Sequence, residues 1–159
     1  MDIYNASHTL SSADILAFTR PPQRRVFYPG DPLFRFGTIV SPTFRGNDIF
    51  GSPWWVPKST YDAIVRTANQ TQKSIVDVAR SRLAVATPWN PTMEWLMEIE
   101  LKKAVYGWVG PARPQPRDGH DRSVLLLGNY GQACVPGLAP PEAMASEAAT
   151  LVYFGSMGV

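Results

Sequence analysis

The stretch KSTYDAIVRTANQTQKSIVDVARSRLAVA, residues 58–86, decides the fold class, because it contains neither proline nor glycine in a chain that has 15 Pro and 12 Gly. Its apolar side chains recur at spacings of three and four, which is typical of one amphipathic helix or of two short helices broken near residues 69–71. These apolar residues are Tyr61, Ile64, Val65, Ala68, Ile75, Val76, Ala79 and Leu83. Ser59 or Thr60 is expected to cap the start of the segment, with Asp62 near the positive end of the helix dipole.

Shorter elements surround this central helical segment. Further helices are predicted over residues 12–18, with Ser11 or Ser12 as the cap, and over residues 141–149. Apolar or alternating runs bounded by turn residues predict strands over residues 32–40, 96–101, 104–109, 123–127 and 150–154. Helices early and in the middle, followed by a run of strands, predict an α+β fold with a mostly antiparallel twisted sheet and helices packed to one side.

The chain has the length and composition of one folded domain. Its 159 residues suit a single domain, with an N-terminal helical arm expected over about residues 1–25 and a core over about residues 26–159. The hydrophobic fraction of 45% and the charged fraction of 18% disfavour a disordered chain, a collagen-like rod and a coiled coil. The sequence has no apolar run long enough for a membrane span and no signal-peptide pattern at its start. We therefore expect a soluble domain, which a dedicated machine could export.

The supply of reactive residues disfavours several classes of site. Cys134 is the only cysteine, and His8 and His120 are the only histidines, so neither a disulfide nor a metal site is expected. The sequence lacks a Gly-x-Ser-x-Gly turn, a Gly-x-Gly-x-x-Gly loop and a Gly-Lys-Ser/Thr loop, which argues against hydrolase triads and conventional nucleotide sites. A formal net charge of +2 does not favour a nucleic-acid partner.

Two motifs in the first half of the chain contain candidate ligand-binding residues. Arg35 lies between two phenylalanines in a strand-forming run, where it either faces solvent by alternation or holds a phosphate or carboxylate. Trp54 and Trp55 are adjacent in the motif GSPWWVP, residues 51–57. Alternation predicts that one indole enters the core while the other lines a cleft and stacks on a planar ring, and core packing of both is the alternative.

Two later motifs contain further candidates. Glu98 and Glu100 alternate along a predicted strand and so share one face, where they either raise one another's pKa for acid–base work or simply meet solvent. Tyr130 and Gln132 lie in a predicted glycine-bracketed loop, residues 128–136. Glycines allow close backbone approach to a ligand, and a carboxamide can orient a ribose hydroxyl or a water, although an ordinary turn also fits.

Taken in order, these motifs resemble those of bacterial ADP-ribosyltransferase-like toxin domains, which cleave the nicotinamide–ribose bond of NAD. The resemblance covers about residues 33–136 and includes a hairpin-like segment, residues 106–115, that looks like one found in polymorphic toxins of this kind. It implies an ADP-ribosyltransferase-like fold, NAD as the substrate, no metal, and a neutralising immunity protein as partner. The catalytic candidates are Gln132, Glu98 and Glu100, and the NAD-binding candidates are Arg35, Ser52, Trp54, Trp55 and Tyr130.

The same resemblance implies a division of roles. Arg35 would bind the NAD diphosphate, and Trp54 or Trp55 would stack near nicotinamide. Gln132, or alternatively Glu98 or Glu100, would stabilise the ribose oxocarbenium ion. Glutamine in the late motif resembles the NAD glycohydrolase toxins, whose acceptor is water, while transfer of ADP-ribose to a macromolecule is the other outcome.

A non-enzymatic module that recognises a protein or a glycan is the alternative. Tyr, Trp and Arg dominate binding hot spots, and the chain has five Trp and six Tyr. The arginines that would join them are Arg20, Arg24, Arg25, Arg113, Arg117 and Arg122. The enzyme hypothesis predicts that Arg35, a tryptophan of the pair and Gln132 surround one cleft, whereas the module hypothesis predicts no shared pocket.

Overall fold

The structure, a computed structural model, describes residues 2–38, 53–138 and 147–157. Its helical elements are α1 (Ser12–Ile15), α2 (Lys58–Thr71), α3 (Ile75–Arg82) and the 3₁₀ turn η1 (Thr87–Trp89). Its strands are β1 (Gln23–Phe27), β2 (Pro32–Gly37), β3 (Trp54–Pro57), β4 (Trp95–Leu101), β5 (Val105–Pro111), β6 (Gln115–Pro116), β7 (Leu125–Leu126), β8 (Gly131–Cys134) and β9 (Ala149–Ser156). None of the helices in these residues is long and apolar enough to cross a membrane.

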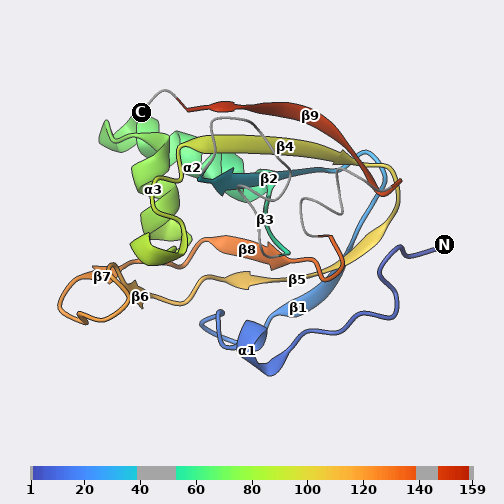
Figure 1. Cartoon of the computed structure of the whole chain (residues 1–159), viewed down its shortest axis with the longest axis horizontal. Helices are drawn as coiled ribbons and strands as arrows, with labels where there is room; N and C mark the ends of the chain where they lie inside the picture. Colours follow the sequence, from blue (N-terminus) through green and yellow to red (C-terminus); the bar gives the residue numbers. More distant parts are fainter. Residues whose placement is uncertain (1, 39–52, 139–146, 158–159) are drawn as a thin grey trace.

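Seven strands form one antiparallel sheet in the order β1-β5-β8-β3-β2-β4-β9, which confirms the α+β class. Strand β3 joins the two halves, because Trp54 and Trp55 pair with β8 while Val56 and Pro57 pair with β2. Figure 1 shows β2, β4 and β9 above, β1, β5 and β8 below, and β3 passing between them. The strands on either side of β3 therefore diverge around its first residues.

The sheet curls around one core and carries helices on its other face. Residues from both halves, including Leu33, Trp55 and Val105, pack into a single buried cluster, which a flat sheet would not allow. Side chains alternate along β2, so Phe34 and Phe36 face the opposite way and pack in a second cluster with α2 and α3. These two helices cover one end of the molecule in Figure 1.

The predicted central segment forms two helices rather than one. Helix α2 ends at Thr71, Gln72 adopts the left-handed conformation, and α3 begins at Ile75, close to the predicted break. The predicted cap of α2 is wrong: Pro57 occupies the N-cap position without a side-chain hydrogen bond, because the helix begins earlier, at Lys58. The cap of α1 is confirmed, since the Ser11 hydroxyl accepts a hydrogen bond from the Asp14 N–H at 3.1 Å. That helix nevertheless ends at Ile15 instead of residue 18.

Four of the five predicted strand regions overlap strands of the main sheet, and residues 123–127 contain only the short β7, which pairs with β6. Four described strands, β1, β3, β6 and β8, lie outside the predicted strand regions. Strand β1 lies at the end of the segment expected to be a helical arm, and β8 lies inside the segment expected to be a loop. The sequence of β8, Gly-Gln-Ala-Cys, has no β-branched or aromatic residue, so its conformation is set by pairing with β3 and β5 rather than by propensity.

Two expected segments fall partly outside the described residues. They are the end of the predicted strand over residues 32–40 and most of the predicted helix over residues 141–149. The described end of the latter is not helical, because residues 147–148 form a turn and Ala149 begins β9.

Candidate active-site pocket

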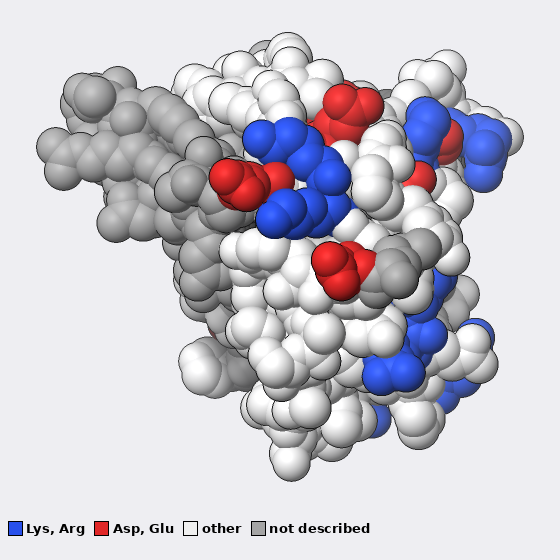
Figure 2. All heavy atoms as spheres, turned by 90° about the vertical axis from the view of Figure 1, so that its right-hand side faces the viewer, with Lys and Arg blue, Asp and Glu red and all other residues white. Residues whose placement is uncertain are grey.

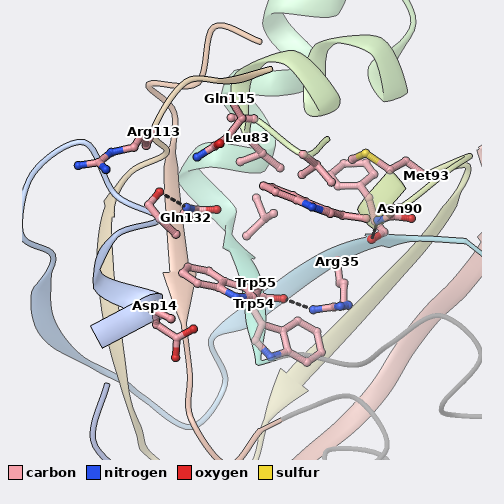
Figure 3. Close-up of a pocket in the computed structure, with 17 residues that line it drawn as sticks. Asp14, Arg35, Trp54, Trp55, Leu83, Asn90, Met93, Arg113, Gln115 and Gln132 are labelled. Carbon is pink, nitrogen blue, oxygen red and sulfur yellow. Dashed lines mark hydrogen bonds between the residues drawn. The ribbon is translucent and has the colours of Figure 1, made fainter. Parts of the chain in front are cut away.

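A cavity of about 340 Å³ lies over the part of the sheet where β3 passes from β8 to β2 (Figure 3). Its walls come from α1, β2, β3, β8, the segment after α3, η1 and the β6 region, so segments far apart in the sequence meet there. A volume of this size lies within the range of ligand pockets in proteins. The lining residues are Ala13, Asp14, Ala17, Arg35, Phe36, Trp54, Trp55, Val56, Leu83, Ala84, Val85, Trp89, Asn90, Met93, Arg113, Gln115 and Gln132.

Arg35 supplies a desolvated cation to this pocket. Its Nη1 donates a hydrogen bond to the carbonyl oxygen of Trp54 at 2.5 Å, which ties the side chain of β2 to the backbone of β3. Burial lowers the pKa of Arg35 to about 10, so the guanidinium still carries its charge at neutral pH. Strand alternation does turn Arg35 away from the phenylalanines on either side, but the side chain lines the pocket and is half-buried rather than solvated.

The two adjacent tryptophans divide between core and pocket. Trp55 is 1% exposed, belongs to the main core, and donates from its indole Nε1 to the Leu138 carbonyl at 2.8 Å. Trp54 is half-buried and packs against Phe18, with ring centroids 5.4 Å apart. Both residues line the cavity, but only Trp54 combines a pocket position with a partly exposed indole.

Gln132 lies on β8 opposite Gly110 of β5. Its Nε2 donates to the Ala17 carbonyl at 3.2 Å, which orients the carboxamide at the pocket wall (Figure 3). Gly110 is needed here because a Cβ atom at this position would lie 2.9 Å from the ring of Phe18. The close approach of Phe18 in turn supports Trp54, so the glycine helps to shape the floor of the pocket.

The other candidates from the sequence do not line the pocket. Glu98 is half-buried on β4, where its charge, after burial, contributes to raising the pKa of Tyr61, and Glu100 is exposed. The Tyr130 hydroxyl lies 2.6 Å from the Thr67 hydroxyl, in hydrogen-bond contact with α2. Ser52 lies outside the described residues.

Sequence reasoning missed the opposite wall of the pocket, which contains Trp89, Asn90 and Met93. The run Thr-Pro-Trp-Asn-Pro, residues 87–91, offered one signal, because a tryptophan between prolines was unlikely to be buried in a regular element. Backbone strain also gathers here: Ala84 and Met93 line the pocket with φ of 53° and 51°. L-residues adopt such angles at a cost, and strained positions cluster at functional sites.

The charges that line the cavity are few and local. Arg35 and Arg113 are the cationic lining residues and Asp14 is the acidic one, and Figure 3 shows Arg113 pointing away from Gln132. Away from the pocket, the face drawn in Figure 2 carries basic and acidic side chains next to one another over its upper part. Within residues 2–38, 53–138 and 147–157, no three His, Cys, Asp or Glu side chains gather as a metal site would require. The pocket therefore offers a half-buried cation, the carboxylate of Asp14, aromatic surfaces and the carboxamides of Asn90, Gln115 and Gln132.

No protein-family profile and no curated protein match this sequence. Two solved structures resemble it at 12% identity. One is Rhs1-CT in complex with the cognate immunity protein RhsI1. The structural alignment covers 89% of this chain and 86% of the matched chain, with a TM-score of 0.53. The other is Tne2 in complex with Tni2, for which the structural alignment covers 85% of this chain and 91% of the matched chain, with a TM-score of 0.52. The chain thus shares the overall fold of Rhs1-CT and Tne2.

Proposed function

We propose that this domain is a toxin-like enzyme of the ADP-ribosyltransferase-like class that cleaves the nicotinamide–ribose bond of NAD. The observation that carries the proposal is the convergence of Arg35, Trp54 and Gln132, from three different strands, around one pocket. A recognition module would not need a half-buried guanidinium, an aromatic face and a fixed carboxamide in the same cavity. An NAD-cleaving site must hold a diphosphate and a planar ring and must stabilise a cationic ribose, and these three groups suit those tasks.

Arg35 binds the diphosphate in this proposal. A guanidinium forms bidentate, charge-assisted hydrogen bonds with phosphate oxygens, and such bonds are stronger where water is excluded. Arg35 is charged at neutral pH in spite of its burial, and its bond to the Trp54 carbonyl holds it beside the aromatic wall. The diphosphate would therefore be fixed next to the ring that receives nicotinamide.

Trp54 and Gln132 act at the reacting end. Trp54 presents a partly exposed indole on which the nicotinamide ring stacks. The bond between ribose C1′ and the nicotinamide nitrogen breaks, its electron pair stays on that nitrogen, and neutral nicotinamide leaves without needing a proton. Gln132 donates its Nε2 hydrogen bond to Ala17, so Oε1 is the end of the carboxamide that faces the developing ribose cation or orients the attacking water.

Water is the acceptor that we propose. Addition of water at C1′ and loss of one proton to solvent gives ADP-ribose, so the overall reaction is hydrolysis of NAD. The two glutamates, which are the alternative catalytic candidates, are not lining residues of this pocket. A neutral carboxamide orients water but is a weak base for activating a protein nucleophile, which favours hydrolysis over transfer to a macromolecule.

We further propose that a neutralising immunity protein binds this domain and that the domain acts inside a target cell after delivery. The support is the shared fold with Rhs1-CT, whose structure was solved with its cognate immunity protein. An enzyme that depletes NAD would harm the cell that makes it, so a neutralising partner is the expected safeguard.

The test compares two arginines that differ in location. Arg35→Met removes the pocket guanidinium, and Arg24→Met removes an exposed arginine on β1 that stacks over Tyr106 at 4.3 Å. Nicotinamide release is measured after circular dichroism has shown that all proteins are folded. We expect kcat/KM to fall about 100-fold or more for Arg35→Met and to stay near wild type for Arg24→Met. Equal rates for the two variants would refute the assigned site.

A further inference from the structure

Trp89 is the most exposed of the large apolar side chains at the pocket, with 63% of its surface accessible. It ends the short turn η1, which crosses the cavity wall formed by the segment after α3. Single exposed apolar side chains are common on protein surfaces, but Trp89 combines this exposure with a position in the wall of a pocket of ligand size. A pocket residue of this kind calls for an explanation in terms of a ligand.

The backbone that carries Trp89 is fixed from several sides. Arg80, which is 6% exposed, donates to the carbonyls of Val85, Asn90 and Pro91 at 3.0, 2.8 and 2.9 Å. The Thr87 N–H donates to the Arg117 carbonyl at 2.8 Å. These bonds come from residues before and after Trp89, so the turn holds its position while the indole stays accessible.

The Asn90 side chain adds a link to the sheet. Its Nδ2 donates to the Phe36 carbonyl at 3.0 Å, and its Oδ1 accepts from the Thr38 hydroxyl at 2.5 Å. Asn90 is therefore engaged in holding the turn against β2, and the aromatic face beside it is the group presented to a ligand. A preorganised aromatic surface binds a planar ring without paying for loop ordering.

The position of the pocket wall that contains Trp89, Asn90 and Met93 indicates which ring of NAD it contacts. Figure 3 shows Asn90 and Met93 on the side of the cavity opposite Gln132 and Asp14. In the proposed function, Gln132 faces the nicotinamide ribose and Arg35 holds the diphosphate, so the part of NAD that extends to the far wall is the adenosine. The neighbouring lining side chains Phe36, Val85 and Met93 are apolar and suit a purine ring rather than a charged group.

We propose that Trp89 is the stacking platform for the adenine ring of the dinucleotide, held in place by Arg80 and Asn90. This inference rests on the proposed function for its orientation of NAD, and it makes Trp89 a binding residue for the adenine end of the dinucleotide. Any nucleobase can stack on an aromatic side chain through its π-face, so an exposed indole on a rigid turn can supply the contact without further hydrogen bonds.

The experiment separates the two ends of the ligand. Dissociation constants for ADP-ribose, AMP and nicotinamide mononucleotide are measured by calorimetry with wild type, Trp89→Ala and Trp89→Phe. Tyr28→Ala is the matched control, because Tyr28 is a 51% exposed aromatic residue that does not line the pocket. We expect Trp89→Ala to weaken ADP-ribose and AMP about tenfold or more, Trp89→Phe to recover most of that loss, and nicotinamide mononucleotide to bind unchanged.

Two outcomes would overturn the inference, namely wild-type affinity of Trp89→Ala for ADP-ribose, or equal weakening of all three ligands. The result is also distinguishable from failure of the proposed function. A wild-type protein that releases nicotinamide while Trp89→Ala keeps its affinity for ADP-ribose refutes the adenine platform alone. A wild-type protein that binds AMP through Trp89 but never cleaves NAD refutes the proposed reaction alone.

Discussion

The two adjacent tryptophans should respond very differently to the same substitution. In Trp55→Phe, the donor to the Leu138 carbonyl is lost, and this acceptor is buried, which costs about 1–3 kcal/mol. The smaller ring also leaves a cavity in the main core, which adds about 1 kcal/mol. Trp55→Phe is therefore expected to lower the free energy of unfolding by about 2–4 kcal/mol.

Trp54→Phe retains an aromatic ring against Phe18 at a half-buried position, so we expect a loss of no more than about 1 kcal/mol. Its effect should appear in NAD turnover instead, because the smaller ring covers less of nicotinamide. Urea unfolding followed by far-ultraviolet circular dichroism measures the free energy of unfolding, and nicotinamide release measures NAD turnover. Equal losses of stability in the two variants, or a larger loss in Trp54→Phe, would refute the division between core and pocket.

Three further predictions follow from particular residues. Gln72→Gly should raise the melting temperature by a few degrees, because Gln72 is exposed with φ of 57° and glycine removes the Cβ strain of this conformation. A lower melting temperature of the variant would contradict this prediction. Burial raises the pKa of Cys134 from 9.0 to about 12, so a thiol reagent at pH 8 should react only as fast as the protein opens. The stability contributed by this thiol is complete below pH 9 and is lost as the pH rises toward 12, which alkaline unfolding would detect. The double variant Glu98→Gln with Glu100→Gln should release nicotinamide within about twofold of wild type, and a large loss would show that the reacting end lies on β4.

The fold was predictable where local pattern and tertiary environment agree. The segment around Ile64 and Val76 has an apolar stripe typical of an amphipathic helix, and the two residues, on α2 and α3, are buried in the second core cluster. The alternation along β2 likewise places Leu33 and Phe34 in different clusters. Strand β8 could not be found in this way, because Gly131–Cys134 becomes a central strand only through pairing with neighbours that are distant in the sequence.

The candidate site likewise contains residues that local sequence predicts and residues that only the tertiary structure reveals. Arg35 is predicted as a cation within an aromatic strand and Gln132 as a carboxamide in a glycine-bracketed loop, and both line the pocket, although Gln132 lies on strand β8. The significance of Trp89 depends on the exposed position of its indole and on the three carbonyl hydrogen bonds of Arg80 that fix its turn. The run at residues 87–91 gives a local signal for the first property only, because Arg80 is simply one more charged residue in a helical pattern until the chain folds over it.

The most direct test of the central claim is the product balance of the reaction. Purified wild-type protein and Gln132→Ala are incubated with NAD, and nicotinamide and ADP-ribose are quantified by liquid chromatography. Hydrolysis at this pocket predicts equal amounts of the two products from wild type. It also predicts that the rate of Gln132→Ala is at least about 100-fold lower than that of wild type, because one group that stabilises the transition state is gone. Unconsumed NAD with folded wild-type protein, or an unchanged rate in Gln132→Ala, would contradict it.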